Sequence, residues 1–479
     1  MKVHQIAFWI FIFFIGGIAL WGFGWSLAGI VVGVATASCM ALFLFVYTGV
    51  SRWIYVVGLV WMVVVGAWYY HAWTVRHFEQ NAVVYGPQEL STTIISYPRS
   101  FGWSQGFLAE TEQGHIISVF VSDWYQFSYG DNVLLSGTLA PLDDDSLYLR
   151  KDMAVGMINN PAVLASESME GFSLKKTLYH VREKFSSVFS HTLSRDHASL
   201  ASGILLGKDS AFFSYELKEA MKNSGTTHLV ALSGFNVTVL INGVFLLLTF
   251  VMSKRRGALV ALCGVVIFVV MTGAEASVVR AALMGSLLVV AQLSSRLFSF
   301  SQAAAGAGCV MLLFNPSLLQ YDVGFLLSFV ALFGIVSLGS SLSVLLRASE
   351  GWWAWSKKAF CETVSAQMMV LPILVFSFHS FSLWGVLSNV LILSLIPFTM
   401  GVAFVVGLAG LVAPVLPSLL SFILTPLLWL EVLIIRVFGG LPLFEVGVGW
   451  VAVVGYYLVA LVVVKIIQRK AFWYGYRTV

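Results

Sequence analysis

Polar side chains recur in this sequence at places where the surrounding residues are apolar. The stretch NSGTTHLVALSGFNVTVLIN, residues 223–242, holds several of them among Leu, Val, Phe and Ile. Ser233-Gly234 is a weak point for a helix there, since Gly costs roughly 1 kcal/mol relative to Ala in a helix interior. A helix broken within a membrane leaves backbone N–H groups that are tolerated only when protein or a wet cavity surrounds them. The stretch therefore predicts a cavity or pore. Its candidate lining residues are His228, Ser233, Gly234, Phe235 and Asn236.

Charged side chains inside other apolar runs are a second signal, and Arg280 is the strongest of them. Buried charges in membrane spans are costly and usually face a bundle interior or a water-filled path. Arg280 lies early in the run TGAEASVVRAALMGSLL, and a guanidinium does not discharge by losing its proton. Glu275 lies five residues earlier, about 140° round a helix, so the two side chains do not share a face. Arg280 therefore needs another partner or an anionic ligand. Later apolar runs add Asp322, Gln367 and Asn389 to the candidates.

Each candidate also has a purely structural interpretation. His228 fits an interfacial histidine, Ser233-Gly234 a helix break with local capping, and Arg280 a salt bridge within a bundle. Asp322 follows Asn315-Pro316, and Asp commonly caps the helix that comes after it, which is the interpretation we favour. Gln367 and Asn389 fit interhelical hydrogen bonds.

The composition identifies the class of protein in which these residues must act. Of 479 residues, 59% are hydrophobic and 10% are charged, whereas soluble domains carry roughly 25% charged residues. The chain is therefore expected to be a polytopic membrane protein. The four cysteines form no CxxC pair and the nine histidines form no HxH pair, so we expect no disulfide, metal or cofactor.

Apolar runs that approach the ~20 residues needed to cross a bilayer predict about twelve spans. They cover residues 6–23, 27–48, 53–73, 229–252, 257–273, 277–294, 299–314, 323–346, 362–378, 383–411, 419–438 and 449–467. The run 383–411 contains Pro397, which predicts a kink or two shorter pieces.

The regions between these runs complete the predicted organisation. Residues 1–80 hold three membrane helices, and 81–165 have the short alternating stretches of a small β domain. This β domain has nine acidic and three basic residues, net −6, so its totals show no basic nucleic-acid patch. Residues 166–225 predict amphipathic interfacial helices, and 226–479 form the main membrane domain. The apolar stripe in 175–193 is expected to lie on the membrane surface or against the bundle.

The distribution of Lys and Arg predicts the orientation. Basic residues gather in connections on one side of the twelve-span arrangement: Lys254, Arg255, Arg256, Arg296, Arg347, Lys357, Lys358, Lys465, Arg469, Lys470 and Arg477, with Lys2 and Arg52. By the positive-inside rule that side is the cytoplasm. Both termini are then cytoplasmic in a plasma membrane, and the β domain lies outside.

Four motifs in order give the chain a resemblance to a known family. They are LASGILLGKDS followed by SGTTHLVALSGFNVTVL (200–240), TGAEASVVRAALM (272–284), NPSLLQYDVGFLLSFVALFGI (315–335) and SAQMMVLPILVFSFHSFSLWGVLSNVLI (365–392). Together they resemble the membrane core of the ComEC competence-protein family, the DNA-uptake channel. The β domain is similar to that family's extracellular OB-like domain.

The resemblance implies a function and a set of partners. It implies a channel that passes single-stranded DNA into the cytoplasm during transformation, working with a separate DNA receptor. Many members end in a metallo-β-lactamase-like domain proposed to degrade one strand. Here about a dozen residues follow the last apolar run, so we expect a separate nuclease and no enzymatic activity in this chain. A GxxxxGK[ST] pattern is absent, so an ATP-driven motor must be a cytoplasmic partner. Assembly into a homo-oligomer is left open.

The resemblance also leads to a hypothesis for transport. The N–H groups of a broken helix near Gly234 and the charge of Arg280 would contact phosphates, and Phe235 and Phe325 would let bases slide past. Many family members have Leu-His where this chain has Phe235-Asn236, so no imidazole role is expected there.

Two other functions fit some of these residues. A small-solute secondary transporter also uses broken helices and buried Arg. An intramembrane serine hydrolase is suggested by Ala231-Leu232-Ser233-Gly234, although its first residue is Ala where the G-x-S-G nucleophile pattern has Gly. A Ser233→Ala variant separates these classes, because it destroys a hydrolase and only modulates a channel.

Overall fold

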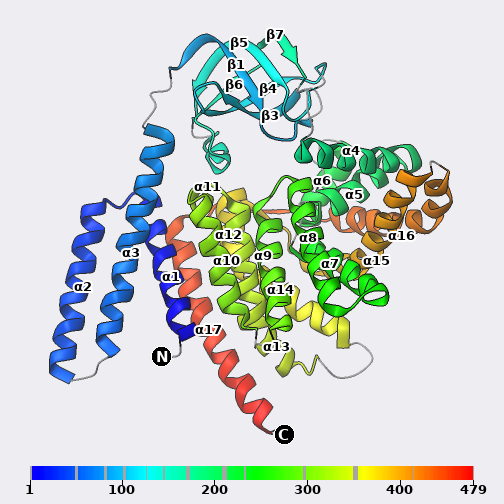
Figure 1. The fold of residues 1–479 in the computed structure, drawn as a ribbon. Coiled ribbons are helices and arrows are strands. Elements are labelled where there is room, and N and C mark those ends of the chain that lie inside the picture. The colour runs from blue at the N-terminus through cyan, green and yellow to red at the C-terminus, as the bar shows by residue number, and fades with distance from the viewer. Residues whose placement is uncertain are drawn as a thin grey trace. The chain divides into compact units, whose positions relative to one another are not determined.

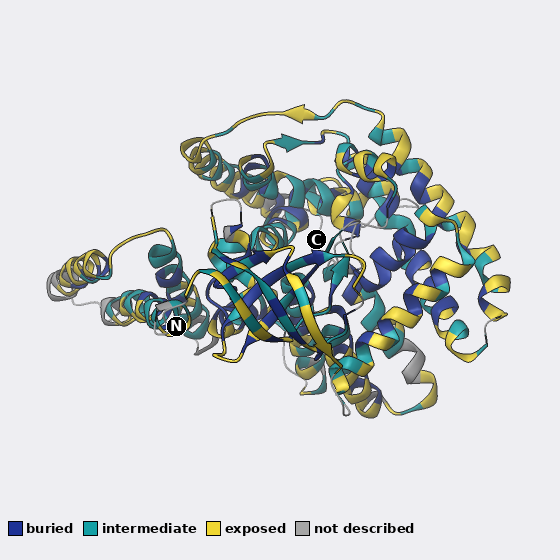
Figure 2. Cartoon of the chain, turned by 90° about the horizontal axis from the view of Figure 1, so that it is seen from above, coloured by how far each residue is buried: buried dark blue, intermediate teal, exposed yellow. Residues whose placement is uncertain are grey.

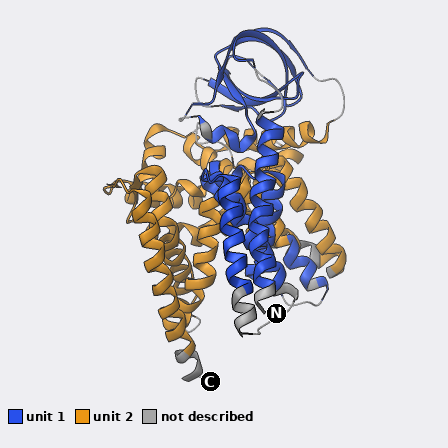
Figure 3. Cartoon of the chain, turned by 90° about the vertical axis from the view of Figure 1, so that its left-hand side faces the viewer, with its two compact units in different colours: residues 1–171, 286–325 blue, residues 172–285, 326–479 orange. Residues whose placement is uncertain are grey.

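The computed structural model describes residues 3–48, 52–79, 84–100, 104–125, 127–143, 146–168, 173–207, 213–230, 234–294, 298–348, 354–413 and 415–477. The chain forms two compact units (Figure 3). The first comprises residues 1–171 and 286–325, and the second comprises residues 172–285 and 326–479.

The first unit begins with three long apolar helices, α1 (Val3–Gly22), α2 (Leu27–Thr48) and α3 (Arg52–Thr74). Glycines let α1 and α3 pack backbone to backbone. A Cβ on Gly17 would lie 2.0 Å from the carbonyl oxygen of Val63, and a Cβ on Gly66 would lie 2.1 Å from that of Phe14. Small residues at such contacts are typical of helix packing in membranes. A π-helical turn, η1 (Val75–Glu79), follows α3, and α10 (Phe300–Phe314) and α11 (Leu318–Tyr321) belong to the same unit.

The β domain of this unit is a small closed barrel (Figure 1). Its strands are β1 (Gly86–Ile94), β2 (Arg99–Ser100), β3 (Ser104–Thr111), β4 (Ile116–Ser122), β5 (Asn132–Pro141), β6 (Gly156–Asn159) and β7 (Ala162–Glu167). Pairing runs β1-β3-β4-β6-β5, and β5 pairs back onto β1, which closes the circuit. The β4–β6 pair is parallel. Alternate residues such as Phe107, Ile117, Val119 and Leu135 fill the interior, and Figure 2 shows the strands carrying both buried and exposed residues.

The second unit joins three shorter helices to long apolar ones. The shorter helices are α4 (Leu174–Thr192), α5 (Arg195–Leu206) and α6 (Tyr215–Asn223). Serine side chains cap two of them, since Ser173 accepts from the N–H of Lys176 in α4 and Ser214 from that of Leu217 in α6. They share one apolar core with α15 (Gly385–Val412) and α16 (Leu416–Gly439). The stripe predicted for 175–193 therefore faces helices of its own unit.

The remaining elements of the second unit follow the predicted apolar runs. They are η4 (Thr227–Leu229), α7 (Gly234–Val251), α8 (Lys254–Thr272), α9 (Ala276–Leu293), α12 (Val323–Gly334), η5 (Ile335–Gly339), α13 (Ser340–Leu345), α14 (Ala354–Phe378), β8 (Ser380–Phe381), β9 (Phe444–Glu445) and α17 (Trp450–Arg477). Helices α9 and α12 pass from one unit into the other.

Helix length and composition bear on the number of spans. Seven helices of the described part are long and apolar enough to cross a membrane, and five shorter apolar helices coincide with the other predicted runs. Helix α15 is continuous through Pro397, so the alternative of two pieces is wrong. A total of about twelve spans stays a prediction.

Candidate functional site

The end of α5 and the start of α7 are joined by a motif residue, Asn236. Helix α5 ends at Gly207, which adopts φ +64°, and its last carbonyls need donors from outside the helix. The side-chain amide of Asn236 donates to the carbonyl oxygen of Ile204 at 3.1 Å, and the Arg182 guanidinium donates to that of Gly207 at 3.2 Å. Asn236 is only 1% exposed. Its amide therefore ties two helices together rather than lining an open path.

Arg280 lies on α9 and points toward the first turn of α7. Its guanidinium donates to the carbonyl oxygen of Ser328 on α12, and it lies 5.7 Å from the centre of the Phe329 ring. The residue is 9% exposed, and among the described residues no carboxylate forms an ion pair with it. A guanidinium has five N–H donors, so most of them are left for another acceptor. The predicted salt bridge is not formed there, and the anion-binding hypothesis keeps its physical basis.

The Arg280 guanidinium occupies the space that a side chain at position 234 would need. A Cβ built on Gly234 would lie 2.7 Å from Nη2 of Arg280 and 3.4 Å from Cβ of Ala281. The positive guanidinium thus rests against the N-terminal end of α7, and the dipole of a helix also favours negative charge at that end. The other two motif candidates give no geometry, because Ser233 and the side chain of Phe235 lie outside the described residues.

His228 lies just before α7, in η4, with an exposed side chain. Desolvation nevertheless lowers its pKa, and a hydrogen bond with the backbone of Gly225 opposes the shift only in part. Because its pKa lies below the usual 6.5, His228 is neutral at pH 7 and offers a phosphate no fixed charge.

The turn before His228 packs on the start of α15. The Ser388 hydroxyl donates to the carbonyl oxygen of Ser224 at 2.8 Å. Gly225, with φ +69°, approaches so closely that its Cβ would lie 3.1 Å from Cα of Gly385. Nε2 of Gln367 would in turn lie 3.4 Å from a Cβ on Gly385. Two of the sequence motifs therefore meet at this contact.

Asn389 lies one turn further along α15 and is 3% exposed. Its Oδ1 has no hydrogen-bond partner in the described part of the chain. Among those residues this oxygen takes no part in the interhelical hydrogen bond predicted for Asn389, which stays a prediction. Asn389 is a buried acceptor that remains open to a ligand or to a moving segment.

Asp322 is a helix cap, as favoured from the sequence. Its Oδ1 accepts from the N–H of Phe325 at 3.2 Å, in the first turn of α12. Phe325 is 4% exposed, so it is a core residue and offers no face on which a base could slide. Asp322 therefore has a structural role at the start of α12.

One acidic residue of α16, which was not among the candidates from the sequence, is buried between helices. Glu431 is fully buried, and its Oε1 accepts from the Thr399 hydroxyl of α15 at 2.6 Å. Its Oε2 has no hydrogen-bond partner within the described ranges. A carboxyl in that position is tolerated only in its neutral form, because an unpaired buried charge is far costlier. A lone Glu in an apolar helix was the available signal.

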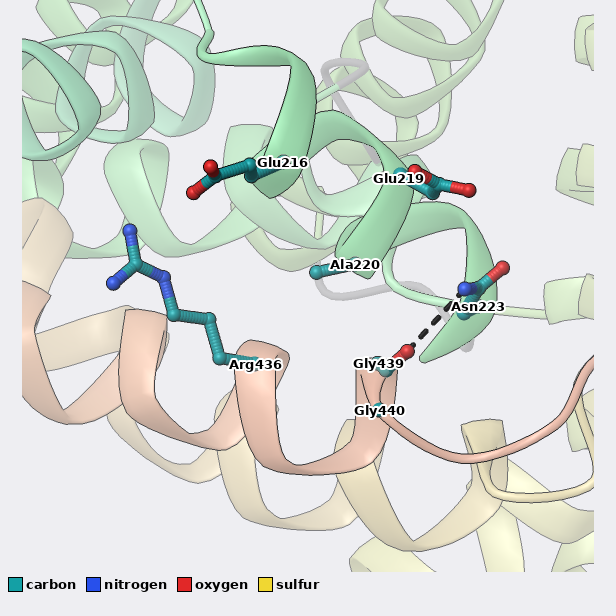
Figure 4. Close-up of a pocket in the computed structure, with 7 residues that line it drawn as sticks. All are labelled: Glu216, Glu219, Ala220, Asn223, Arg436, Gly439 and Gly440. Carbon is teal, nitrogen blue, oxygen red and sulfur yellow. Dashed lines mark hydrogen bonds between the residues drawn. The ribbon is translucent and has the colours of Figure 1, made fainter.

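A cavity of about 260 Å³ lies on the second unit between α6 and α16 (Figure 4). Its lining residues are Glu216, Glu219, Ala220, Asn223, Arg436, Gly439 and Gly440. Asn223 closes it by donating to the carbonyl oxygen of Gly439 at 3.3 Å, and Arg436 pairs with Asp196 at 3.0 Å. Two carboxylates and a paired arginine make this cavity a poor site for a polyanion. No cluster of three or more His, Cys, Asp or Glu side chains suited to a metal ion occurs among the described residues.

Comparison with known proteins covers most of this second unit. A sequence model of the competence protein family, described as "Competence protein", matches residues 204–472. ComE operon protein 3 of Bacillus subtilis (strain 168) is 29% identical over 227 residues, which are 47% of this chain and 28% of that protein. The chain thus matches less than a third of the length of that relative. No solved structure matches the chain.

Proposed function

Because the chain belongs to the competence protein family, we propose that it forms a membrane channel that passes single-stranded DNA into the cytoplasm during DNA uptake. The observation that carries this proposal is Arg280, a buried guanidinium that faces a helix N-terminus and has no carboxylate partner among the described residues. A threaded polyanion needs favourable positions for phosphates that do not hold it permanently. One guanidinium beside one helix end supplies such a position.

The path runs beside the first turn of α7, in this proposal. Arg280 and the first turn of α7 contact successive phosphates, and His228 contributes a neutral polar ring at the entrance. Asn236, Asp322 and Phe325 act as structural residues around it. The motion is driven by other proteins, namely a cytoplasmic ATP-driven motor, and a separate receptor and nuclease supply the single strand.

The β domain is an OB-type barrel in this proposal. A closed circuit of five strands with a parallel β4–β6 pair supports that assignment. Its net charge of −6 disfavours tight binding of a phosphate backbone, so a strand that passes the domain is not held there. About twelve spans, with both termini in the cytoplasm, complete the arrangement.

Uptake of end-labelled DNA tests the channel directly. Label protected inside the cytosol is measured in a deletion strain that carries the wild-type chain, Arg280→Ala, Arg280→Lys or Arg256→Ala. Arg256 is an exposed arginine at the start of α8 and serves as the matched control. We expect Arg280→Ala to lower uptake about tenfold, the size of one charged hydrogen bond, with Arg280→Lys in between and the control unchanged.

Two results would contradict the proposal. Uptake that continues unchanged in the deletion strain would end the channel function. Uptake of a small solute that depends on Arg280, with DNA uptake unaffected, would favour a secondary transporter instead.

A further inference from the structure

The third sequence motif, which begins at Asn315, contacts the β domain. This contact has no part in the transport path described above. In the first unit a short 3₁₀ helix of the β domain, η2 (Leu147–Asp152), descends from the barrel toward α11 (Figure 1). The last carbonyls of such a helix have few internal donors, and that of Arg150 accepts from the N–H of Met153 at 3.0 Å. The side-chain amide of Asn315 donates to the carbonyl oxygen of Lys151 at 2.6 Å, and the Ser317 hydroxyl donates to that of Arg150 at 3.0 Å. The end of η2 is therefore capped by residues next to α11.

The side chain of Arg150 makes the second half of this contact. Its guanidinium carbon lies 5.4 Å from the centre of the Phe78 ring and 5.7 Å from that of the Tyr321 ring. Its Nη1 also donates to the Tyr321 hydroxyl at 3.3 Å. Phe78 belongs to η1 and Tyr321 to α11, so one cation contacts two elements far apart in sequence. Cation–π contacts of this kind are strongest where water is excluded.

The receiving side is itself fixed to the membrane helices of the same unit. The Tyr70 hydroxyl of α3 donates to Oε1 of Gln320 at 3.1 Å. The Tyr69 hydroxyl, one residue earlier on α3, donates to the carbonyl oxygen of Leu313 at the end of α10. Asn315 and Ser317 are buried, and the N–H of Ser317 donates to Oδ1 of Asn315 at 3.1 Å, which shapes the Asn-Pro-Ser turn. The turn is thus a preformed receptor rather than a loose connection.

We propose that residues 315–321 are a docking site for η2, and that Arg150 is the positioning residue that holds the β barrel in a fixed orientation on α3, α10 and α11. The contacts of η2 attach the barrel to these helices at a point other than its two chain connections. For transport, this deepens the proposed function and rests on it, because a fixed barrel delivers a strand to one place.

Distance measurements test the docking without reference to transport. Spin labels are placed on Phe23→Cys and Thr138→Cys, two exposed positions of the first unit, in a full-length chain without its four native cysteines. Lys151→Ala is the matched control, since the Lys151 side chain forms no hydrogen bond or ion pair within the described ranges. We expect one narrow distance for the wild type and the control. Arg150→Ala should raise the undocked, broadly distributed population roughly tenfold, as expected for the loss of two cation–π contacts and a hydrogen bond.

A change on the receiving side keeps the test valid if Arg150→Ala disturbs the barrel. Tyr321→Leu removes the ring and the hydroxyl without touching the β domain, and Tyr321→Phe removes the hydroxyl alone. We expect broadening for Leu and a small effect for Phe. Distances as narrow as the wild type in both Arg150→Ala and Tyr321→Leu would overturn the docking site.

DNA uptake by the same variants separates the two proposals. Lower uptake, with surface-bound DNA unchanged and the conservative Arg150→Lys variant partly restored, supports the positioning role. Broadened distances with normal uptake would leave the docking in place but overturn its role in delivery. Loss of uptake through Arg280→Ala would still stand in that case.

Discussion

Gly234 is the residue through which the position of Arg280 can be tested without removing its charge. A Cβ at Gly234 would overlap the guanidinium at 2.7 Å, whereas a Cβ at Gly243 on the same helix meets nothing within 4 Å. We expect Gly234→Ala to displace the guanidinium and to lower DNA uptake severalfold, because charge-assisted contacts depend on geometry. Gly243→Ala lies inside α7 and favours the helix by up to about 1 kcal/mol, so thermal unfolding should not fall in that variant.

Gly243→Ala is the control for this prediction. Uptake equal to the wild type in both alanine variants would mean that the placement of Arg280 against α7 has no part in transport. A fall in both would point to the flexibility of α7 instead of to the guanidinium.

The contacts of single residues also show what a sequence reveals at this scale. The cap formed by Asp322 joins residues three apart, and it could be predicted because the chain itself places the acceptor beside the donor. Asn236 and Ile204 are 32 residues apart, and nothing in the local pattern identified that carbonyl as the partner. Polar residues in apolar runs were found from the sequence, but their partners were not.

Helix α14 shows how one element compensates for the irregularity of another. Pro372 lies within α14, and a proline has no N–H to donate to the carbonyl four residues earlier, that of Met368. The Tyr456 hydroxyl of α17 donates to this carbonyl at 2.8 Å, and the Tyr457 hydroxyl donates to that of Met369 at 2.9 Å. Neighbouring side chains of this kind make proline tolerable in membrane helices.

Helix α17 also contacts a second irregular turn. Residues Ile335–Gly339 form a π-helical turn, and Nε2 of Gln468 on α17 donates to the carbonyl oxygen of Ser337 there at 3.0 Å. Gly334, just before the turn, allows close packing on α14, since its Cβ would lie 2.6 Å from the carbonyl oxygen of Ser365. Helix α17 therefore bridges two weak points that can bend.

The hydrogen bond from the Tyr456 hydroxyl to the Met368 carbonyl can be tested by measuring its coupling energy with Pro372. We expect Tyr456→Phe to destabilise the protein by about 0.5–1.5 kcal/mol, because it leaves the Met368 carbonyl without a donor. In a Pro372→Ala background the restored N–H satisfies that carbonyl, so the same substitution should cost less. Thermal unfolding of the four proteins in lipid nanodiscs gives the coupling. Tyr55→Phe, an exposed tyrosine of α3, should cost almost nothing.

Equal costs for Tyr456→Phe in the two backgrounds would show that the tyrosine packs on α14 without replacing the missing hydrogen bond. The bridge would then be a simple contact between helices.

For the whole molecule, hydropathy predicted where the helices lie and turn residues predicted the β domain. All twelve apolar runs contain helices, because length and apolarity are local properties of the chain. The docking of η2 was not predicted, since Arg150 and Tyr321 are 171 residues apart. A contact between such distant residues produces no hydrophobic periodicity or local motif in the sequence. The amphipathic stripe of 175–193 was predicted with the membrane surface and the helix bundle as alternatives. It packs with α15 and α16, and the sequence left that choice open because a stripe does not identify the surface that covers it.

The number of spans decides on which side of the membrane the two termini lie. Within the described ranges seven helices are long and apolar enough to cross a membrane, and an odd number of spans would place the termini on opposite sides. The twelve predicted spans are an even number, and the cluster of Lys and Arg in the tail then places both termini in the cytoplasm. We expect Thr138→Cys in the β domain to react with a membrane-impermeant maleimide in intact cells. Lys470→Cys, which is also exposed, should react only after the membrane is permeabilised. Labelling of Lys470→Cys in intact cells would show that some of the shorter apolar helices do not cross the bilayer, and the proposed path beside α7 would have to begin on the other face.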